Sequence, residues 1–192
     1  FSGNGSSGFE QYANTAAEVP YFQRCVFYGN ATGANNMEQG YFEGCVFALN
    51  SSYGIKTDNY LVYIRVSNSV FFNNGSHGFY HATASFDGYA QMCLIERSIF
   101  RSNGGYGISK AGRINGIYTN YLCMSNNTSG SCSYNSGTLL GTGHVLEDPG
   151  FANEGAGTED FTPRNTNLIV TRNTGYGSTY DYIGAIQPEP PA

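Results

Sequence analysis

Three charged residues each stand an even number of positions before a phenylalanine, and their spacing would suit catalysis on a sheet surface. Glu43 and Glu96 each precede a phenylalanine by four residues, and Arg65 precedes one by six. If these segments are parallel strands, alternate residues share a face, so the two glutamates lie on it, two strands apart, with Arg65 on the strand between them. The glutamate backbones would then be about 9.6 Å apart. That separation is near the upper limit for the acid and base of an inverting glycosidase.

The same three residues also fit a structural role, which is the interpretation that we favour. A Glu-Arg-Glu arrangement on an exposed sheet face is commonly a cross-strand charge network. We therefore expect a protein that is not an enzyme and that needs no cofactor. The alternative is a polysaccharide lyase or glycoside hydrolase that uses Glu43, Arg65 and Glu96.

Four further residues are candidates for binding a glycan or a partner protein. Tyr41 and Tyr63 fall on the same predicted sheet face as Arg65. Asp58 and Asp87 fall in two long loops between predicted strands, and loops are where recognition residues concentrate.

The elements that position these residues follow from an internal repeat. Phenylalanine followed three positions later by asparagine occurs five times, and in a sixth copy Cys123 takes the aromatic place. Successive copies are 20 to 29 residues apart, which is the period of a solenoid whose repeats stack on one another. The asparagines that end the six phrases are Asn4, Asn30, Asn50, Asn74, Asn103 and Asn126.

The segments between these phrases have the composition of short strands. Residues 21–27 and 61–66 are rich in aromatic and β-branched side chains and are bounded by Gly, Asn and Ser. The pattern predicts three short strands for each coil, with an asparagine at a recurrent turn. Because asparagine tolerates left-handed backbone angles and its amide can pair with its own copy in the next coil, we expect a ladder of amides inside the solenoid.

At this point the chain resembles the right-handed parallel β-helix superfamily, the pectin-lyase-like proteins. The pattern that carries the resemblance is a strand followed by x-x-Cys/Ser-Val-Phe-x-x-Asn-x-x-x-Gly-Phe/Ile, and it covers about residues 1–135. The resemblance implies an all-β, right-handed parallel β-helix solenoid of about five to six coils with a C-terminal capping segment. It is nearest in style to repeat proteins of phage virions and secreted proteins.

The resemblance says little about activity, because the same scaffold carries lyases, hydrolases and inert fibres. The polygalacturonases of this superfamily have Asn-Thr-Asp, Asp-Asp, Gly-His-Gly and Arg-Ile-Lys motifs, and none of the four occurs in this sequence. We therefore expect a structural β-helix of a phage virion or a cell surface, located on the virion surface or outside the cell. Its expected partners are other subunits, including copies of itself, and polysaccharides.

Three segments follow from the extent of the repeat. Residues 1–135 form the coils, and because Phe1 already lies inside a repeat phrase, we expect the first coil to be incomplete at its N-terminal side. Residues 136–187 form a C-terminal cap, since the last coil would otherwise expose a hydrophobic cross-section. Residues 188–192 are rich in proline and form an extended tail.

The composition argues against two classes of partner. Charged residues make up 12% of the 192 residues and the net charge is −5, whereas nucleic-acid binding requires clustered basic residues. No apolar run is long enough to span a membrane.

The remaining candidate features are structural ones. Five cysteines leave the pairs Cys25/Cys45 and Cys123/Cys132 open as disulfides, although buried thiols are favoured. His77 and His81 are four residues apart, but they lie in a coil, so we expect surface histidines and no metal site. An apolar row precedes the aromatic positions and, if it points outward, would suit contact with other subunits. The row consists of Val26, Val46, Val70, Ile99 and Leu122.

Overall fold

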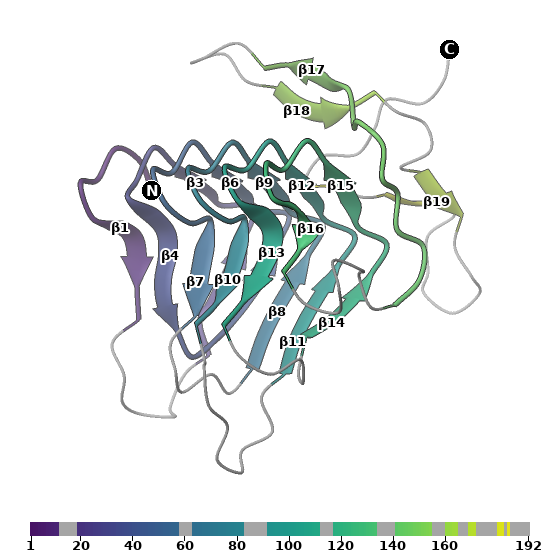
Figure 1. Cartoon of the computed structure of the whole chain (residues 1–192). Coiled ribbons are helices and arrows are strands. Elements are labelled where there is room, and N and C mark those ends of the chain that lie inside the picture. The colour runs from purple at the N-terminus through teal and green to yellow at the C-terminus, as the bar shows by residue number, and fades with distance from the viewer. Residues whose placement is uncertain are drawn as a thin grey trace.

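The chain forms an all-β parallel solenoid, which confirms the predicted fold class (Figure 1). This computed structural model describes residues 1–11, 19–57, 63–82, 92–111, 117–133, 141–154, 160–164, 169–171, 180–182 and 184. No helix occurs in these residues. The solenoid completes about 4 turns, slightly fewer than the five to six coils that we expected.

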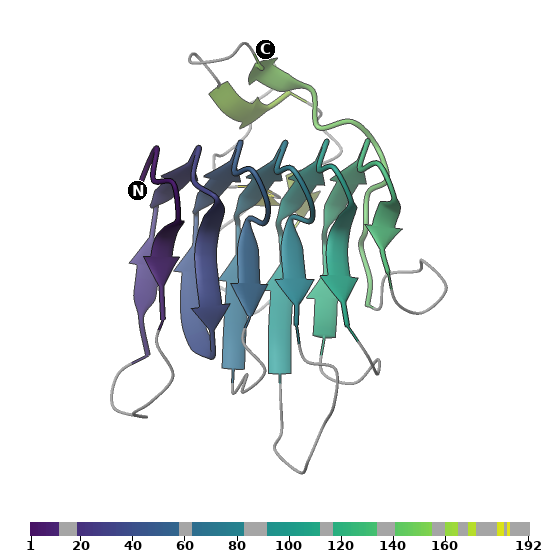
Figure 2. The same cartoon turned by 60° about the vertical axis from the view of Figure 1, so that its left-hand side comes forward.

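Three parallel sheets make up the walls of the solenoid (Figure 2). The β1 sheet contains β1 (Ser7–Glu10), β4 (Thr32–Met37), β7 (Ile55–Thr57), β10 (Phe79–His81), β13 (Tyr106–Lys110) and β16 (Gly130–Cys132). The β2 sheet contains β2 (Tyr21–Gln23), β5 (Gln39–Glu43), β8 (Tyr63–Ser67), β11 (Met92–Glu96) and β14 (Ile117–Asn120). The β3 sheet contains β3 (Val26–Tyr28), β6 (Val46–Ala48), β9 (Val70–Phe72), β12 (Ile99–Arg101) and β15 (Cys123–Ser125).

A column of phenylalanine rings runs through the core from coil to coil. The rings of Phe27, Phe47, Phe71 and Phe100 stack with centroids 4.6, 4.8 and 4.4 Å apart and are fully buried. In the last coil Met124 pairs with Phe100, so the prediction that Cys123 takes this place is wrong. The longer side chain of Met124 fills the space of a phenylalanine ring, and Cys123 points to the other face of the strand.

The asparagine ladder exists, and four of its members are buried. The Nδ2 of Asn50 donates to Asn74 Oδ1 at 2.9 Å, and the Nδ2 of Asn74 donates to Asn103 Oδ1 at the same distance. Asn30 is also buried, and at the first coil Asn4 donates to Asn30 Oδ1 while remaining exposed. The ladder therefore satisfies amide groups that would otherwise be buried without partners.

The last ladder residue is Asn127, which corrects the predicted Asn126. Asn103 Nδ2 donates to Asn127 Oδ1 at 2.8 Å, whereas Asn126 is exposed and has a φ of 53°. In earlier coils the residue before the ladder asparagine has the same left-handed angle, as at Leu49 and Ser102. The turn strain thus lies one position before the ladder, and the one-residue shift follows from the entry of Met124 into the core.

The outward apolar row of the β3 sheet is covered by the chain's own C-terminal segment. The hairpin of β17 (Phe151–Asn153) and β18 (Asp160–Pro163) lies over this sheet (Figures 1 and 2). Its rings Phe151 and Phe161 pack on Phe72, in one buried cluster with the apolar row. Arg101 fixes the segment through ion pairs with Asp148 and Glu154.

Two members of the predicted row depart from it. Leu122 is buried in the solenoid core, and Cys123 takes the outward position instead. Val26, at the other end of the row, is 49% exposed. A second antiparallel pair, β19 (Ile169–Thr171) and β20 (Tyr180–Tyr182), follows the hairpin in the sequence.

Residues 142–145 lie beside the last coil and satisfy part of its open edge. The Tyr121 N–H donates to the Thr142 carbonyl at 2.8 Å, and the Met124 N–H donates to the Val145 carbonyl at 2.9 Å. This short pairing continues the β3 sheet by one bridge, between Cys123 and Val145. The tail 188–192 lies outside the described residues.

All five cysteines are free thiols, so neither of the two possible disulfides forms. Burial raises the pKa of Cys45, Cys93 and Cys123 to about 12, which keeps these thiols protonated and unreactive. His77 is half-buried, but the expectation of a surface residue is wrong for His81, which is fully buried. Successive residues of β10 point to opposite faces of the sheet, and His81 is on the inward face with Phe79. Its Nδ1 lies 3.0 Å from Thr57 Oγ1.

Candidate functional site

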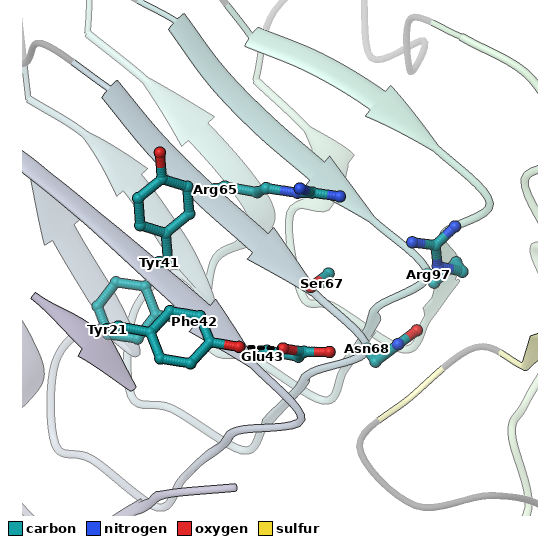
Figure 3. A pocket seen from close by; sticks show the side chains of 8 residues that line it. All are labelled: Tyr21, Tyr41, Phe42, Glu43, Arg65, Ser67, Asn68 and Arg97. Atoms are coloured by element: carbon teal, nitrogen blue, oxygen red, sulfur yellow. Dashed lines mark hydrogen bonds between the residues drawn. The ribbon is translucent and has the colours of Figure 1, made fainter. Parts of the chain in front are cut away.

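The outer face of the β2 sheet carries a shallow pocket of about 160 Å³ (Figure 3). Strand alternation turns Phe22, Ile64 and Ile95 inward, so the residues beside them face solvent. The side chains that line the pocket include Tyr21, Tyr41, Glu43, Arg65, Asn68 and Arg97. The three residues Tyr41, Glu43 and Arg65 that the sequence placed on one face are therefore brought together.

The predicted Glu-Arg-Glu row is two adjacent columns. Glu43, Ser67 and Glu96 pair across successive strands, so Ser67 lies between the two glutamates. Arg65 belongs to the neighbouring column, between Tyr41 and Leu94. The prediction placed Arg65 on the correct strand. Along that strand, however, Arg65 lies two residues before Ser67, which is the residue that pairs with the glutamates.

The two glutamates belong to different contacts. Glu96 Oε1 lies 2.6 Å from an Arg65 guanidinium nitrogen and 3.1 Å from one of Arg97. Glu43 accepts a hydrogen bond from the Tyr21 hydroxyl (Figure 3). That bond to Glu43 raises the pKa of Tyr21, so the phenol keeps its proton at neutral pH. The face thus presents a phenol and two guanidinium groups that are held in place by carboxylates.

A row of tyrosine rings runs along the same face. The ring centroids of Tyr21 and Tyr41 are 6.3 Å apart, and those of Tyr41 and Tyr63 are 5.5 Å apart. Tyr21 is 58% exposed, which leaves much of its ring open to solvent. Exposed aromatic rings beside charged hydrogen-bonding groups can bind a ligand that has both an apolar face and hydroxyl or acidic groups.

Arg97 and Asn68 also belong to this site, although neither was predicted from the sequence. Both have left-handed backbone angles, with φ of 48° and 47°, at the turn that joins the β2 and β3 sheets. Gly44 holds the equivalent position in another coil. The repeat could have indicated this turn, because the residue three positions before the aromatic occupies it in four coils. These residues are Arg24, Gly44, Asn68 and Arg97.

Tyr118 belongs to the exposed column and not to the core. In β14 Thr119 pairs with the buried Ile95, so Tyr118 faces outward and is 57% exposed. The reason is the same one-residue shift that places Met124 in the core. The remaining two candidates, Asp58 and Asp87, lie outside the described residues.

Among the described residues, no group of three or more His, Cys, Asp or Glu residues is placed to hold a metal ion. The same residues contain no helix with the length and hydrophobicity needed to cross a membrane.

No protein-family model, curated protein or solved structure matches this chain.

Proposed function

We propose that this chain is a non-enzymatic surface β-helix whose β2-sheet face binds polysaccharide. The observation that carries the proposal is the row of Tyr21, Tyr41 and Tyr63 beside Arg65 and Arg97. Tyrosine rings offer flat apolar surfaces to the C–H face of a sugar, and guanidinium groups donate hydrogen bonds to hydroxyl or carboxylate oxygens. A backbone of stacked strands keeps these groups in place before the ligand arrives, which lowers the entropy cost of binding.

The spacing of the site suits an extended chain. Tyr21, Tyr41 and the column through Arg65 stand on successive strands, about 4.8 Å apart. This repeat is close to the length of one sugar unit in an extended polysaccharide. A linear chain that runs along the solenoid axis would therefore meet one strand at each unit, first Tyr21, then Tyr41, then Arg65.

The biological setting in this proposal is a phage virion or a cell surface, and the fold belongs to the pectin-lyase-like superfamily. The Phe-x-x-Asn repeat and the parallel solenoid support the superfamily. Contact with other subunits is supported by exposed apolar side chains at the N-terminal end of the solenoid. Phe1 is 53% exposed, Val26 is 49% exposed and Val19 is 42% exposed.

Replacing Tyr41 with alanine tests the binding face. Loss of one stacking ring should weaken the affinity for polysaccharide about tenfold. Isothermal titration with polygalacturonate, alginate and xylan measures it. Leu146→Ala is the matched control, because Leu146 is 69% exposed and does not line the pocket. Equal affinities for the parent and the Tyr41→Ala protein would count against this face.

A lyase or glycosidase remains the second candidate, and one contact favours it. Glu43 and the Tyr21 hydroxyl share a hydrogen bond at the edge of the same pocket as Arg65, an arrangement that could move a proton. If the enzyme interpretation is right, the parent protein cleaves a polysaccharide of the panel, and Glu43→Gln or Glu96→Gln lowers the rate at least about a hundredfold. We expect instead that reducing-end and unsaturated-product assays detect no turnover by the parent protein.

A further inference from the structure

A second group of aromatic side chains lies on the outer face of the β1 sheet. Tyr53, His77 and Tyr106 each follow a ladder asparagine by three residues, so they occupy the same position in three successive coils. Backbone hydrogen bonds confirm the alignment, since Gly54 N–H donates to the His77 carbonyl and Gly78 N–H donates to the Tyr106 carbonyl. All three side chains are half-buried, and none lines the pocket on the β2 sheet.

His77 stands at the centre of this aromatic group. Its ring centroid is 5.9 Å from that of Tyr53, 5.6 Å from that of Tyr80 and 5.8 Å from that of Tyr106. Tyr53 and Tyr80 stack on each other at 5.0 Å with an interplanar angle of 13°. The four side chains therefore form one continuous patch across three coils.

The imidazole of His77 is held in one orientation and one tautomer. Its Nδ1 accepts a hydrogen bond from the Tyr106 backbone N–H at 2.9 Å, so the neutral ring carries its proton on Nε2. Burial lowers the pKa of His77, which favours this neutral form. The ring rests against Gly105, where an added Cβ would lie 2.3 Å from Nδ1. Among the described residues no hydrogen bond to Nε2 is found, so its N–H can donate to a ligand.

A positive charge stands beside the patch. Lys56 on β7 pairs directly with Tyr80 on β10, so the two side chains project from neighbouring strands on the outer face. Lysine occurs at only two positions in the chain, 56 and 110, on a protein whose net charge is −5. One of the few cations on this acidic protein is thus placed next to a cluster of half-buried rings.

We propose that Tyr53, His77, Tyr80 and Lys56 form a second binding site, for an acidic sugar unit such as a uronate. The tyrosine rings would take the apolar C–H face of the sugar, and its carboxylate would accept hydrogen bonds from the Lys56 ammonium and the His77 Nε2–H. The neutral imidazole and the ammonium together favour an anionic ligand over a neutral one. The site does not depend on polysaccharide binding by the β2 sheet.

Site-resolved NMR tests the proposal on the intact chain. Digalacturonate is titrated into the protein while the imidazole signals of His77 and the guanidinium signals of Arg65 and Arg97 are followed, with neutral cellobiose as the comparison ligand. Digalacturonate should shift the His77 signals in a saturable way, and cellobiose should bind more weakly. Lys56→Gln should raise the Kd at this site roughly tenfold, as expected for the loss of one charged hydrogen bond. His77→Phe, which keeps a ring but neither nitrogen, should weaken it similarly.

The two binding sites give separate outcomes. Tyr41→Ala is the control and should leave the His77 response unchanged. Shifts at Arg65 and Arg97 without a response at His77 would overturn this second site and leave the proposed function standing. A His77 response without shifts at the two arginines would support the second site and count against the first. A His77 response that Lys56→Gln does not weaken would overturn the assignment of an acidic ligand.

Discussion

Asn74→Ala should lower the free energy of unfolding by about 3–5 kcal/mol, because it breaks the amide ladder in the middle of the solenoid. The Asn74 Nδ2 donates to the Phe47 carbonyl at 3.1 Å and to Asn103 Oδ1, and its Oδ1 accepts from Asn50. Alanine removes all of these bonds, and the buried Asn50 backbone N–H, which donates to Asn74 Oδ1, loses that partner. Urea denaturation followed by circular dichroism measures the change.

A pair of adjacent asparagines provides the control for this effect. Asn127→Ala should also destabilise, although less, because Asn127 is half-buried at the end of the ladder. Asn126→Gly should change stability by no more than about 0.5 kcal/mol, since glycine keeps the left-handed φ of 53° and Asn126 is exposed. The reverse order of these two variants would show that the last coil has the register that the sequence suggested.

The protein should lose stability as the pH falls below about 6.5, and His81 should account for about 3 kcal/mol of that loss. Burial, helped by the charge of Lys110, lowers the pKa of His81 from 6.5 to about 4. The folded state therefore resists protonation, while the unfolded chain takes up a proton near pH 6.5. Stability is full above this pH, declines between about 6.5 and 4, and levels off for this residue below pH 4.

The local contacts of His81 explain why it stays neutral. Thr57 Oγ1 accepts a hydrogen bond from the Ala82 N–H and lies 3.0 Å from His81 Nδ1, with which it shares a second hydrogen bond. Nε2 is buried and has no hydrogen-bond partner among the described residues, so the positive charge of a doubly protonated ring would be poorly solvated. His81→Gln removes the titrating group and should flatten the decline, measured as urea midpoints from pH 7 to pH 4. Parallel pH curves for the parent and the variant would contradict this role.

The solenoid could be predicted from the sequence because each coil repeats the same two structural requirements. An aromatic ring must fill the core, and an asparagine must satisfy backbone and amide groups three positions later. The prediction slipped by one residue in the last coil, where Cys123 and Met124 are adjacent and Asn126 and Asn127 are adjacent. Both registers fit the repeat there, and only the size of the side chain that enters the core separates them.

Features outside the repeat were less predictable. The apolar row of the β3 sheet was identified, but the segment that covers it carries no repeat, so nothing in the sequence paired Phe151 and Phe161 with Phe72. His81 was misplaced because it was assigned to a coil, whereas it lies in β10, where strand alternation turns it inward.

The residues of the β2-sheet face were found through strand alternation, which places Tyr41, Glu43 and Arg65 on one side. Their hydrogen bonds were not, because the partner of each side chain depends on which column it occupies. The contact of Glu43 with Tyr21 appears only when the neighbouring strands are aligned.

The β2-sheet face should hold a polysaccharide without cutting it, and one measurement addresses both binding and the absence of cleavage. Polymers of defined length from the same panel are incubated with the parent protein and with Tyr21→Ala/Tyr41→Ala, and the complexes are separated by size-exclusion chromatography with light scattering. We expect at least one polymer to co-elute with the parent protein at unchanged length. The same polymer should not co-elute with the double variant. Shortened polymer would show that the protein cuts the chain. Equal co-elution of the double variant would show that Tyr21 and Tyr41 do not form the binding face.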